Sequence, residues 1–219
     1  MTRPPTTDRD SAAAPTTVVE VFADVWCPFA HVGLRRFVEH RALVSRDDLV
    51  LRVRAWPLEL VNGSPLDPAS TATHVAELRE QVAPDLFGSF DVDAFPVSSL
   101  DALALAAVAY EAGERVGERV SLALRDALFE AGRNIGDAAV LRAIAAEQGI
   151  AAPGPDAVDL VLVDWEEGKR RGVRGSPEFF VKGRGYFCPT LDITPVDGGL
   201  HIVRDIESLT AFLDAVLEN

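Results

Sequence analysis

The chain has only two cysteines, Cys27 and Cys188, among its 219 residues. A secreted protein held together by disulfide bonds would carry more cysteines at closer spacing, so the sequence argues against that class. A chain of this length can bury a hydrophobic core without such bonds. Because thiols in the cytosol are normally kept reduced, we expect both cysteines to be free.

Positive charge is scarce as well. Lys and Arg number 21 against 34 Asp and Glu, which gives a formal net charge of −13. A strongly acidic surface repels phosphate groups, which argues against nucleic acid and an anionic membrane surface as partners. No apolar run reaches the length of a transmembrane helix. Residues 1–17 lack the apolar stretch of a secretory signal, so we expect a disordered tail and a cytoplasmic protein.

The rest of the chain shows the residue spacings of strands and helices. The predicted order is strand 18–23, helix 29–43, strand 49–56, a turn-rich loop at 62–68, a nearly all-helical block at 69–148, helix 156–171, strands 178–181 and 185–187, a short strand at 200–203, and helix 205–217. A strand-helix-strand unit and a helix-hairpin-helix unit are the two halves of a thioredoxin fold. The sequence therefore predicts an α/β, thioredoxin-like core, residues 18–68 and 154–219, with a helical insertion at 69–153.

Cys27 comes directly after the first predicted strand and directly before a helix that Pro28 can begin. The first N–H groups of a helix have no partner within the helix, and the helix dipole is positive there. Both effects stabilise a thiolate relative to a thiol, so we expect a lowered pKa at Cys27 and a nucleophilic sulfur. The alternative is a small apolar side chain in the core.

His31 follows Cys27 by four residues, a spacing that places the two on one face of a helix. An imidazolium there would favour the thiolate, and a neutral imidazole would move a proton, which makes His31 a second candidate catalytic residue. The alternative, which we favour slightly, is a partly buried histidine with a backbone partner.

A second feature is Ser176-Pro177, directly before the predicted strand at 178–181. A cis bond there would turn the Ser176 backbone outward as a hydrogen-bonding edge for a substrate. Taken alone, these residues are explained more simply by an ordinary trans proline that begins an edge strand.

The segment 24–33 resembles the active-site segment of DsbA-like oxidoreductases, especially the FrnE type, in which a strand is followed by Asp, Cys-Pro-Trp-Cys, an aromatic residue and Gly. Further segments resemble the same family: 56–60, 134–137 with 141–149, and 172–180. The likeness covers nearly the whole chain after the tail. It implies a thioredoxin core with a helical insertion, a cis Pro177 facing Cys27, and disulfide or thiol-conjugate chemistry. The expected substrate-binding residues are Trp26, Pro28, Phe29, Ser176 and Pro177.

The sequence departs from this family at one decisive place. Ala30 stands where the motif has its second cysteine, and His31 stands where it has the aromatic residue. In a two-cysteine site the first thiolate attacks and the second resolves the mixed disulfide. Without the second cysteine, a small thiol resolves it, or Cys188 does. Alternatively, Cys27 assists a bound thiol cofactor, as in the related kappa glutathione transferases and 2-hydroxychromene-2-carboxylate isomerases.

The other candidates also have structural explanations, which we favour for Cys188 and for the two acidic residues. Cys188 ends the second strand of the predicted hairpin, where an inert buried cysteine and a resolving cysteine both fit. Asp24 and Glu178 flank the predicted site as proton-transfer groups or as salt-bridged acids. Trp26 and Phe29 either line a pocket or pack against neighbouring elements. The histidines have no metal-ligand spacing, so no metal is predicted.

Three functions are therefore considered. The first is a DsbA-like thiol-disulfide oxidoreductase that works through Cys27 alone. The second is an isomerase or transferase that uses glutathione or mycothiol, with an apolar substrate pocket in the helical insertion. The third is a non-catalytic thioredoxin-fold binding protein. We expect no tightly bound cofactor and a small-molecule thiol or disulfide as partner, and a homodimer remains open.

Overall fold

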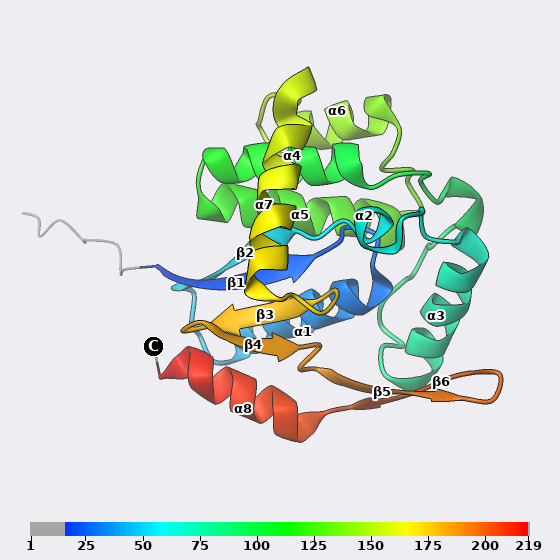
Figure 1. Cartoon of the computed structure of the whole chain (residues 1–219), viewed down its shortest axis with the longest axis vertical. Helices are drawn as coiled ribbons and strands as arrows, with labels where there is room; N and C mark the ends of the chain where they lie inside the picture. The colour runs from blue at the N-terminus through cyan, green and yellow to red at the C-terminus, as the bar shows by residue number, and fades with distance from the viewer. Residues whose placement is uncertain (1–15, 219) are drawn as a thin grey trace, which may run out of the picture.

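A four-stranded sheet in the order β2-β1-β3-β4 forms the centre of the computed structural model, which describes residues 16–218 (Figure 1). Its strands are β1 (Thr17–Ala23), β2 (Leu49–Ala55), β3 (Glu178–Val181) and β4 (Arg184–Phe187). β2 runs parallel to β1, whereas β3 is antiparallel to both β1 and β4. The predicted tail lies outside the described residues, except for its last two positions.

Both faces of this sheet are covered by helices. Helices α1 (Pro28–Leu43) and α8 (Ile206–Leu217) cover one face, where Phe179 of β3 packs between Phe37 and Phe212. Helix α7 (Val158–Arg171) covers the other. A Cβ atom on Gly168 of α7 would lie 2.5 Å from the Trp56 ring, so glycine lets this helix approach the sheet closely. This arrangement confirms the predicted α/β class with both halves of the core.

The helical insertion packs beside the exposed edge of β2. Its helices are α3 (Pro68–Gln81), α4 (Leu100–Glu111), α5 (Glu114–Phe129) and α6 (Ala138–Glu147), and the short helix α2 (Leu58–Asn62) precedes it. Three side chains form hydrogen bonds with the backbone groups on the outer edge of β2. Glu118 accepts from Leu51 N–H, the Tyr110 hydroxyl accepts from Val53 N–H and donates to Leu51 C=O, and Asp164 of α7 accepts from Ala55 N–H.

Two segments in this part of the chain differ from the sequence-based prediction. Residues 82–99 are irregular apart from a 3₁₀ turn at Val92–Ala94, although the sequence pattern predicts a nearly all-helical block. Pro84 and Pro96 lie in this stretch, and proline lacks the N–H that continues a helix. The short helix α2 is also absent from the prediction, and it ends at Gly63, whose backbone is left-handed with φ 71°.

The predicted short strand at 200–203 is real but is half of a hairpin. β5 (Leu191–Val196) and β6 (Gly199–Arg204) form a separate two-stranded sheet that packs on α3. Pro195 lies within β5, and a proline argues against a strand when only sequence is considered. The Asp197-Gly198 pair between the strands is a common hairpin signal, and Gly198 has φ 88°.

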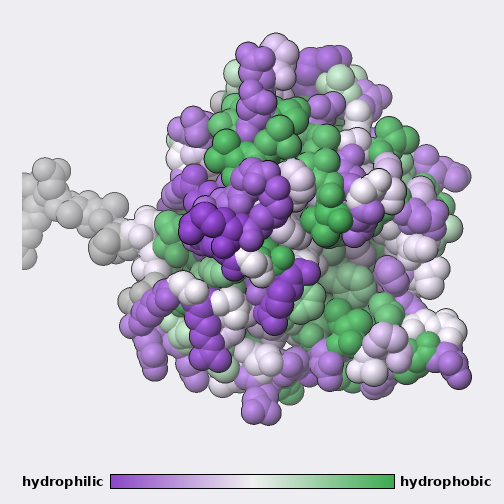
Figure 2. Space-filling view, in the orientation of Figure 1, coloured by the Kyte–Doolittle hydropathy of each residue, from purple (hydrophilic) through white to green (hydrophobic). Residues whose placement is uncertain are grey.

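The face shown in Figure 2 carries an apolar patch over the first half of α7, followed by a hydrophilic surface over its second half. Leu162 and Val163, at 38% and 64% exposure, belong to this patch. Within the described residues, no helix is long and apolar enough to cross a membrane.

Candidate active site around Cys27

Cys27 is the N-cap residue of α1, and Pro28 occupies the first turn, as predicted. The thiol is 3% exposed, and its Sγ donates a hydrogen bond to the backbone oxygen of Ser176 at 3.2 Å. The two residues are separated by 149 positions in the chain. The fold therefore brings together the two segments that the sequence singled out.

Ser176 and Pro177 are joined by a cis peptide bond. The Ser176 hydroxyl accepts a hydrogen bond of 2.9 Å from the backbone N–H of Asp24, so the loop is tied to the end of β1. On the other side, the Pro177 carbonyl accepts from the backbone N–H of Cys188 at 2.9 Å. This dipeptide thus contacts the segment that carries Cys27 and the segment that carries Cys188.

Burial raises the pKa of the Cys27 thiol above its usual value. The Ser176 hydroxyl and the N–H groups of Ala30 and Phe29 act in the opposite direction, and the charge of Asp24 adds to the rise. The expectation of a lowered pKa was therefore wrong in its net sign. The helix start does favour the thiolate, but loss of water around an enclosed sulfur outweighs it.

Asp24 lies under the turn that leads to Cys27 and is fully buried. Its Oδ2 accepts a 2.5 Å hydrogen bond from Leu58 N–H, whereas its Oδ1 has no partner among the described residues. Burial raises the pKa of this carboxyl to about 6. Asp24 is therefore an acid that changes charge just below neutral pH, close to the sulfur.

His31 is buried at 1% exposure, and its Nε2 forms a 2.7 Å hydrogen bond with Oε1 of Glu130. Its ring packs against those of Phe87 and Phe129. Burial lowers the pKa of His31 despite the carboxylate, so the ring is neutral at neutral pH. These contacts are those of a structural histidine whose partner is a side chain rather than the backbone, and a catalytic role for His31 stays a prediction.

The two aromatic candidates pack into the insertion. Trp26 is fully buried and stacks on Phe95 with 5.6 Å between ring centroids. Phe29 is half-buried, and its ring lies 5.4 Å from that of His74 on α3. For Trp26 the structure favours packing over a pocket wall, whereas Phe29 keeps some access to solvent.

Cys188 follows β4 and is also a buried free thiol. Burial raises the pKa of Cys188 to about 12, and the charge of Cys27 contributes to the rise. At neutral pH this residue is therefore a thiol, and only Cys27 has helix N–H groups that favour ionisation.

Glu178, the other flanking acid, is 3% exposed and accepts hydrogen bonds from the backbone and side chain of Arg174. It is therefore a salt-bridged structural acid. Among residues 16–218, no three His, Cys, Asp or Glu side chains gather closely enough to hold a metal ion.

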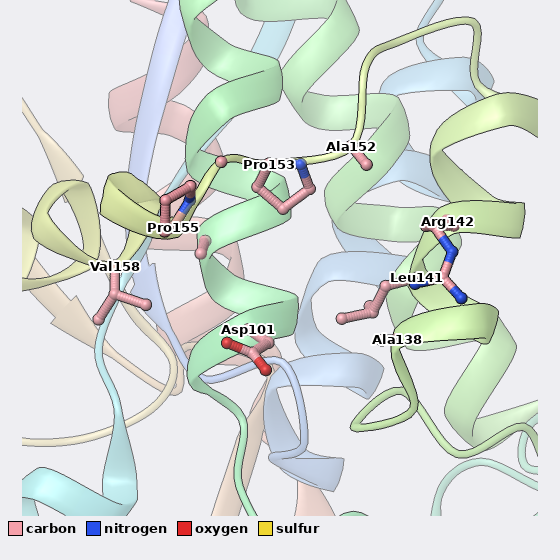
Figure 3. Close-up of a pocket in the computed structure, with 10 residues that line it drawn as sticks. Asp101, Ala138, Leu141, Arg142, Ala152, Pro153, Pro155 and Val158 are labelled. Carbon is pink, nitrogen blue, oxygen red and sulfur yellow. The ribbon is translucent and has the colours of Figure 1, made fainter.

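A cavity of about 320 Å³ lies between α4, α6 and the segment that leads into α7 (Figure 3). Its walls are mostly apolar, with Asp101 and Arg142 as charged side chains. Neither Cys27 nor any of its hydrogen-bond partners lines this cavity. An organic molecule held there would not contact the sulfur.

Comparisons with known proteins identify the family to which the Cys27 and Ser176–Pro177 segments point. The family model described as a DSBA-like thioredoxin domain matches residues 18–195. The chain belongs to the DsbA-like thioredoxin family. A sequence search of curated proteins finds no match for this DsbA-like protein.

Solved structures of the same fold cover most of this DsbA-like chain. A proposed protein disulfide isomerase from Nitrosomonas europaea has TM-score 0.64 and 15% identity, covering 93% of this chain and 98% of its own. The cytosolic disulfide reductase DsbM from Pseudomonas aeruginosa has TM-score 0.55 and 16% identity, covering 92% and 99%. A 2-hydroxychromene-2-carboxylate isomerase has TM-score 0.56 and 13% identity, covering 78% and 88%. At these identities the likeness establishes the fold.

Glu130 was not singled out by the sequence, yet it joins three segments of the site region. Its carboxylate accepts hydrogen bonds from His31 and from the backbone N–H groups of Phe87 and Gly88. Although burial raises the pKa of Glu130, these bonds lower it to about 2. The folded state therefore holds this carboxylate ionised far into the acid range.

Glu130→Gln is expected to flatten the acid dependence of stability. In the wild type, the contribution of Glu130 is complete above the unfolded pKa of 4.5 and is lost as pH falls toward the folded pKa of about 2. Urea unfolding at a series of pH values measures the slope. The exposed Glu80→Gln is the matched control and should keep the wild-type slope. An unchanged slope in Glu130→Gln would contradict the assignment.

Proposed function

We propose that this protein is a thiol-disulfide oxidoreductase that uses Cys27 alone and exchanges disulfides with a small thiol such as glutathione or mycothiol. The observation that carries the proposal is the placement of Cys27 at the start of α1, bonded to Ser176, with Ala30 in place of a second cysteine. Membership of the DsbA-like family supports thiol chemistry at this position.

The proposed cycle has two exchange steps. The Cys27 thiolate attacks one sulfur of a disulfide, forms a mixed disulfide and releases the other half as a thiolate. A small thiolate then attacks the mixed disulfide, takes the bound half as a new disulfide and restores the Cys27 thiolate. Across the two steps, one half of the substrate disulfide leaves as a thiolate and the other half leaves joined to the small thiol in a new disulfide, so no other electron donor is needed.

The burial of Cys27 sets two conditions on this cycle. At 3% exposure, the sulfur is reached only when the side chains around it move. The raised pKa also keeps most of the sulfur protonated at neutral pH. We therefore expect exchange to be slow at neutral pH and to accelerate as pH rises.

A mixed-disulfide assay tests the proposal. The reduced protein is incubated with oxidised glutathione or the disulfide of mycothiol, and each cysteine-containing peptide is examined by mass spectrometry. We expect an adduct on Cys27 that is removed by the corresponding thiol, with release of a second disulfide. Absence of any adduct on Cys27, at any pH at which the protein stays folded, would contradict the proposal.

One observation favours the second function, a thiol-cofactor isomerase or transferase. Cys27 is a protonated hydrogen-bond donor beside the Ser176–Pro177 edge. Such a donor is better suited to holding a thiol cofactor by a hydrogen bond than to forming a disulfide with it. The fold is shared with an isomerase and with DsbM, whose structure is also known with GSH. Non-covalent binding of reduced glutathione or mycothiol, without an adduct in the assay above, would select this function.

The proposed cycle requires a compartment that is rich in small thiols. Resolution by a small thiol needs that thiol in excess, which is the condition of the cytosol. We therefore propose a cytoplasmic location.

A further inference from the structure

Arg125 of α5 is enclosed at 1% exposure next to the Cys27 turn. Its Nη2 donates a 3.1 Å hydrogen bond to the backbone oxygen of Asp24, and its Nη1 donates to the carbonyl and hydroxyl oxygens of Ser121. The positively charged side chain of Arg125 thus reaches from the helical insertion to the end of β1. The sequence did not single out this residue.

This guanidinium lacks the usual partner of a buried cation. Among residues 16–218 no carboxylate lies within ion-pair distance of Arg125, and its Nε has no hydrogen-bond partner. A buried charge is costly unless an opposite charge compensates it. Burial accordingly lowers the pKa of Arg125 to about 10, which still leaves it charged at neutral pH.

Arg125 also holds the turn that presents the sulfur. The Asp24 carbonyl that accepts from Arg125 also accepts from the backbone N–H of Cys27, at 3.4 Å. One oxygen therefore joins the cation on α5 to the residue that caps α1. Loss of the guanidinium would leave this turn with one hydrogen bond fewer and would remove a cation whose charge interacts with Cys27.

We propose that Arg125 is a positioning residue that fixes the Asp24–Cys27 turn and supplies the positive charge that balances the Cys27 thiolate. The inference deepens the proposed function, because the thiolate is the form that attacks a disulfide. It is nevertheless testable without turnover, because the ionisation of a thiol is measured directly.

The titratable groups that face Arg125 come from three elements. Asp24 and Cys27 lie on the turn between β1 and α1, His31 lies on α1, and Tyr110 lies on α4. Near neutral pH, His31 and Tyr110 are uncharged, so the Asp24 carboxylate and the Cys27 thiolate, once it forms, are the two anions that a single cation serves. The carboxylate of Asp24 raises the pKa of Cys27. Removing Asp24 and removing Arg125 should therefore shift Cys27 in opposite directions.

The test is the pH dependence of alkylation of Cys27 in the full-length reduced protein. Iodoacetamide is the probe, and peptide-resolved mass spectrometry separates Cys27 from Cys188. For Arg125→Met we expect the pKa of Cys27 to rise by about 1 or more, with about tenfold slower alkylation at neutral pH. Arg125→Lys, which keeps the charge, should restore most of the wild-type profile.

Arg41→Met is the matched control for general damage. It removes a partly buried arginine that pairs with Glu118 of the same helix α5, so it weakens the packing of α5 without touching the Cys27 turn. Its alkylation profile should keep the wild-type midpoint. An equal shift in Arg41→Met and Arg125→Met would assign the effect to packing and overturn the proposal.

Asp24→Asn provides a second arm if Arg125→Met does not fold, as judged by circular dichroism. With its carboxylate gone, Arg125 serves Cys27 alone, so we expect the pKa of Cys27 to fall below the wild-type value. An unchanged or raised pKa would overturn the proposal. If alkylation behaves as expected but the protein forms no mixed disulfide, the charge balance stands and the oxidoreductase function fails.

Discussion

Cys27→Ser is expected to eliminate disulfide exchange by this DsbA-like protein, with a loss of about 10³-fold or more. The reason is that a serine hydroxyl neither ionises near neutral pH nor forms a disulfide, while its size still fits the site beside Ser176. The measurement is the rate at which a reporter disulfide is reduced by a small thiol, together with the adduct on residue 27.

Cys188→Ser is the matched control. Its backbone hydrogen bond to Pro177 does not depend on the side chain, so the adduct on Cys27 should persist at the wild-type rate. If instead the mixed disulfide becomes longer-lived in Cys188→Ser, Cys188 is the resolving thiol. If Cys27→Ser retains full exchange activity, the thiol mechanism fails. If the wild type shows no exchange and every biological readout survives Cys27→Ser, the non-catalytic binding function gains.

Ala30→Cys is expected to convert the site into a two-cysteine centre. Residue 30 lies three positions after Cys27 in the first turn of α1, the Cys-X-X-Cys spacing of thioredoxin-like redox sites. A thiol there competes with external thiols at a high effective concentration. We expect the mixed disulfide on Cys27 to be resolved about 10²-fold faster, with formation of an intramolecular disulfide between Cys27 and the introduced thiol.

Ala30→Ser is the control for this gain. Ala30 is fully buried, so both variants place a polar or larger atom in the same enclosed position, but only one adds a thiol. Quenched time points resolved by mass spectrometry distinguish mixed from intramolecular disulfides. A mixed disulfide with the same lifetime in Ala30→Cys as in the wild type would show that residue 30 does not reach the sulfur.

The strands and helices of the core were predictable because each depends on local spacing. The alternation in β2 and the start of α1 at Pro28 are properties of adjacent residues. The β5–β6 hairpin was half missed because its stability depends on contact with α3, where Gln81 bonds both Leu200 and Ile202. Contacts between segments distant in sequence leave no periodic pattern in either segment.

The site shows the same division. The approach of Cys27 to Ser176 followed from two motifs that the family pairs, whereas the sign of the Cys27 pKa shift did not. Local geometry favours the thiolate, but burial depends on how segments distant in the sequence, such as that of Ser176, pack around the turn. Arg125 and Glu130 were missed because their roles depend on where their side chains point in the folded protein. In the sequence they do not stand out, because other positions on α5 are also charged.

The outward side of β2 has a consequence for self-association. An unpaired sheet edge is a template on which another chain adds a strand and begins to aggregate. Here the N–H groups of Leu51, Val53 and Ala55 are already bonded to side chains from α4, α5 and α7. The insertion and α7 together therefore block intermolecular strand addition along this border of the sheet.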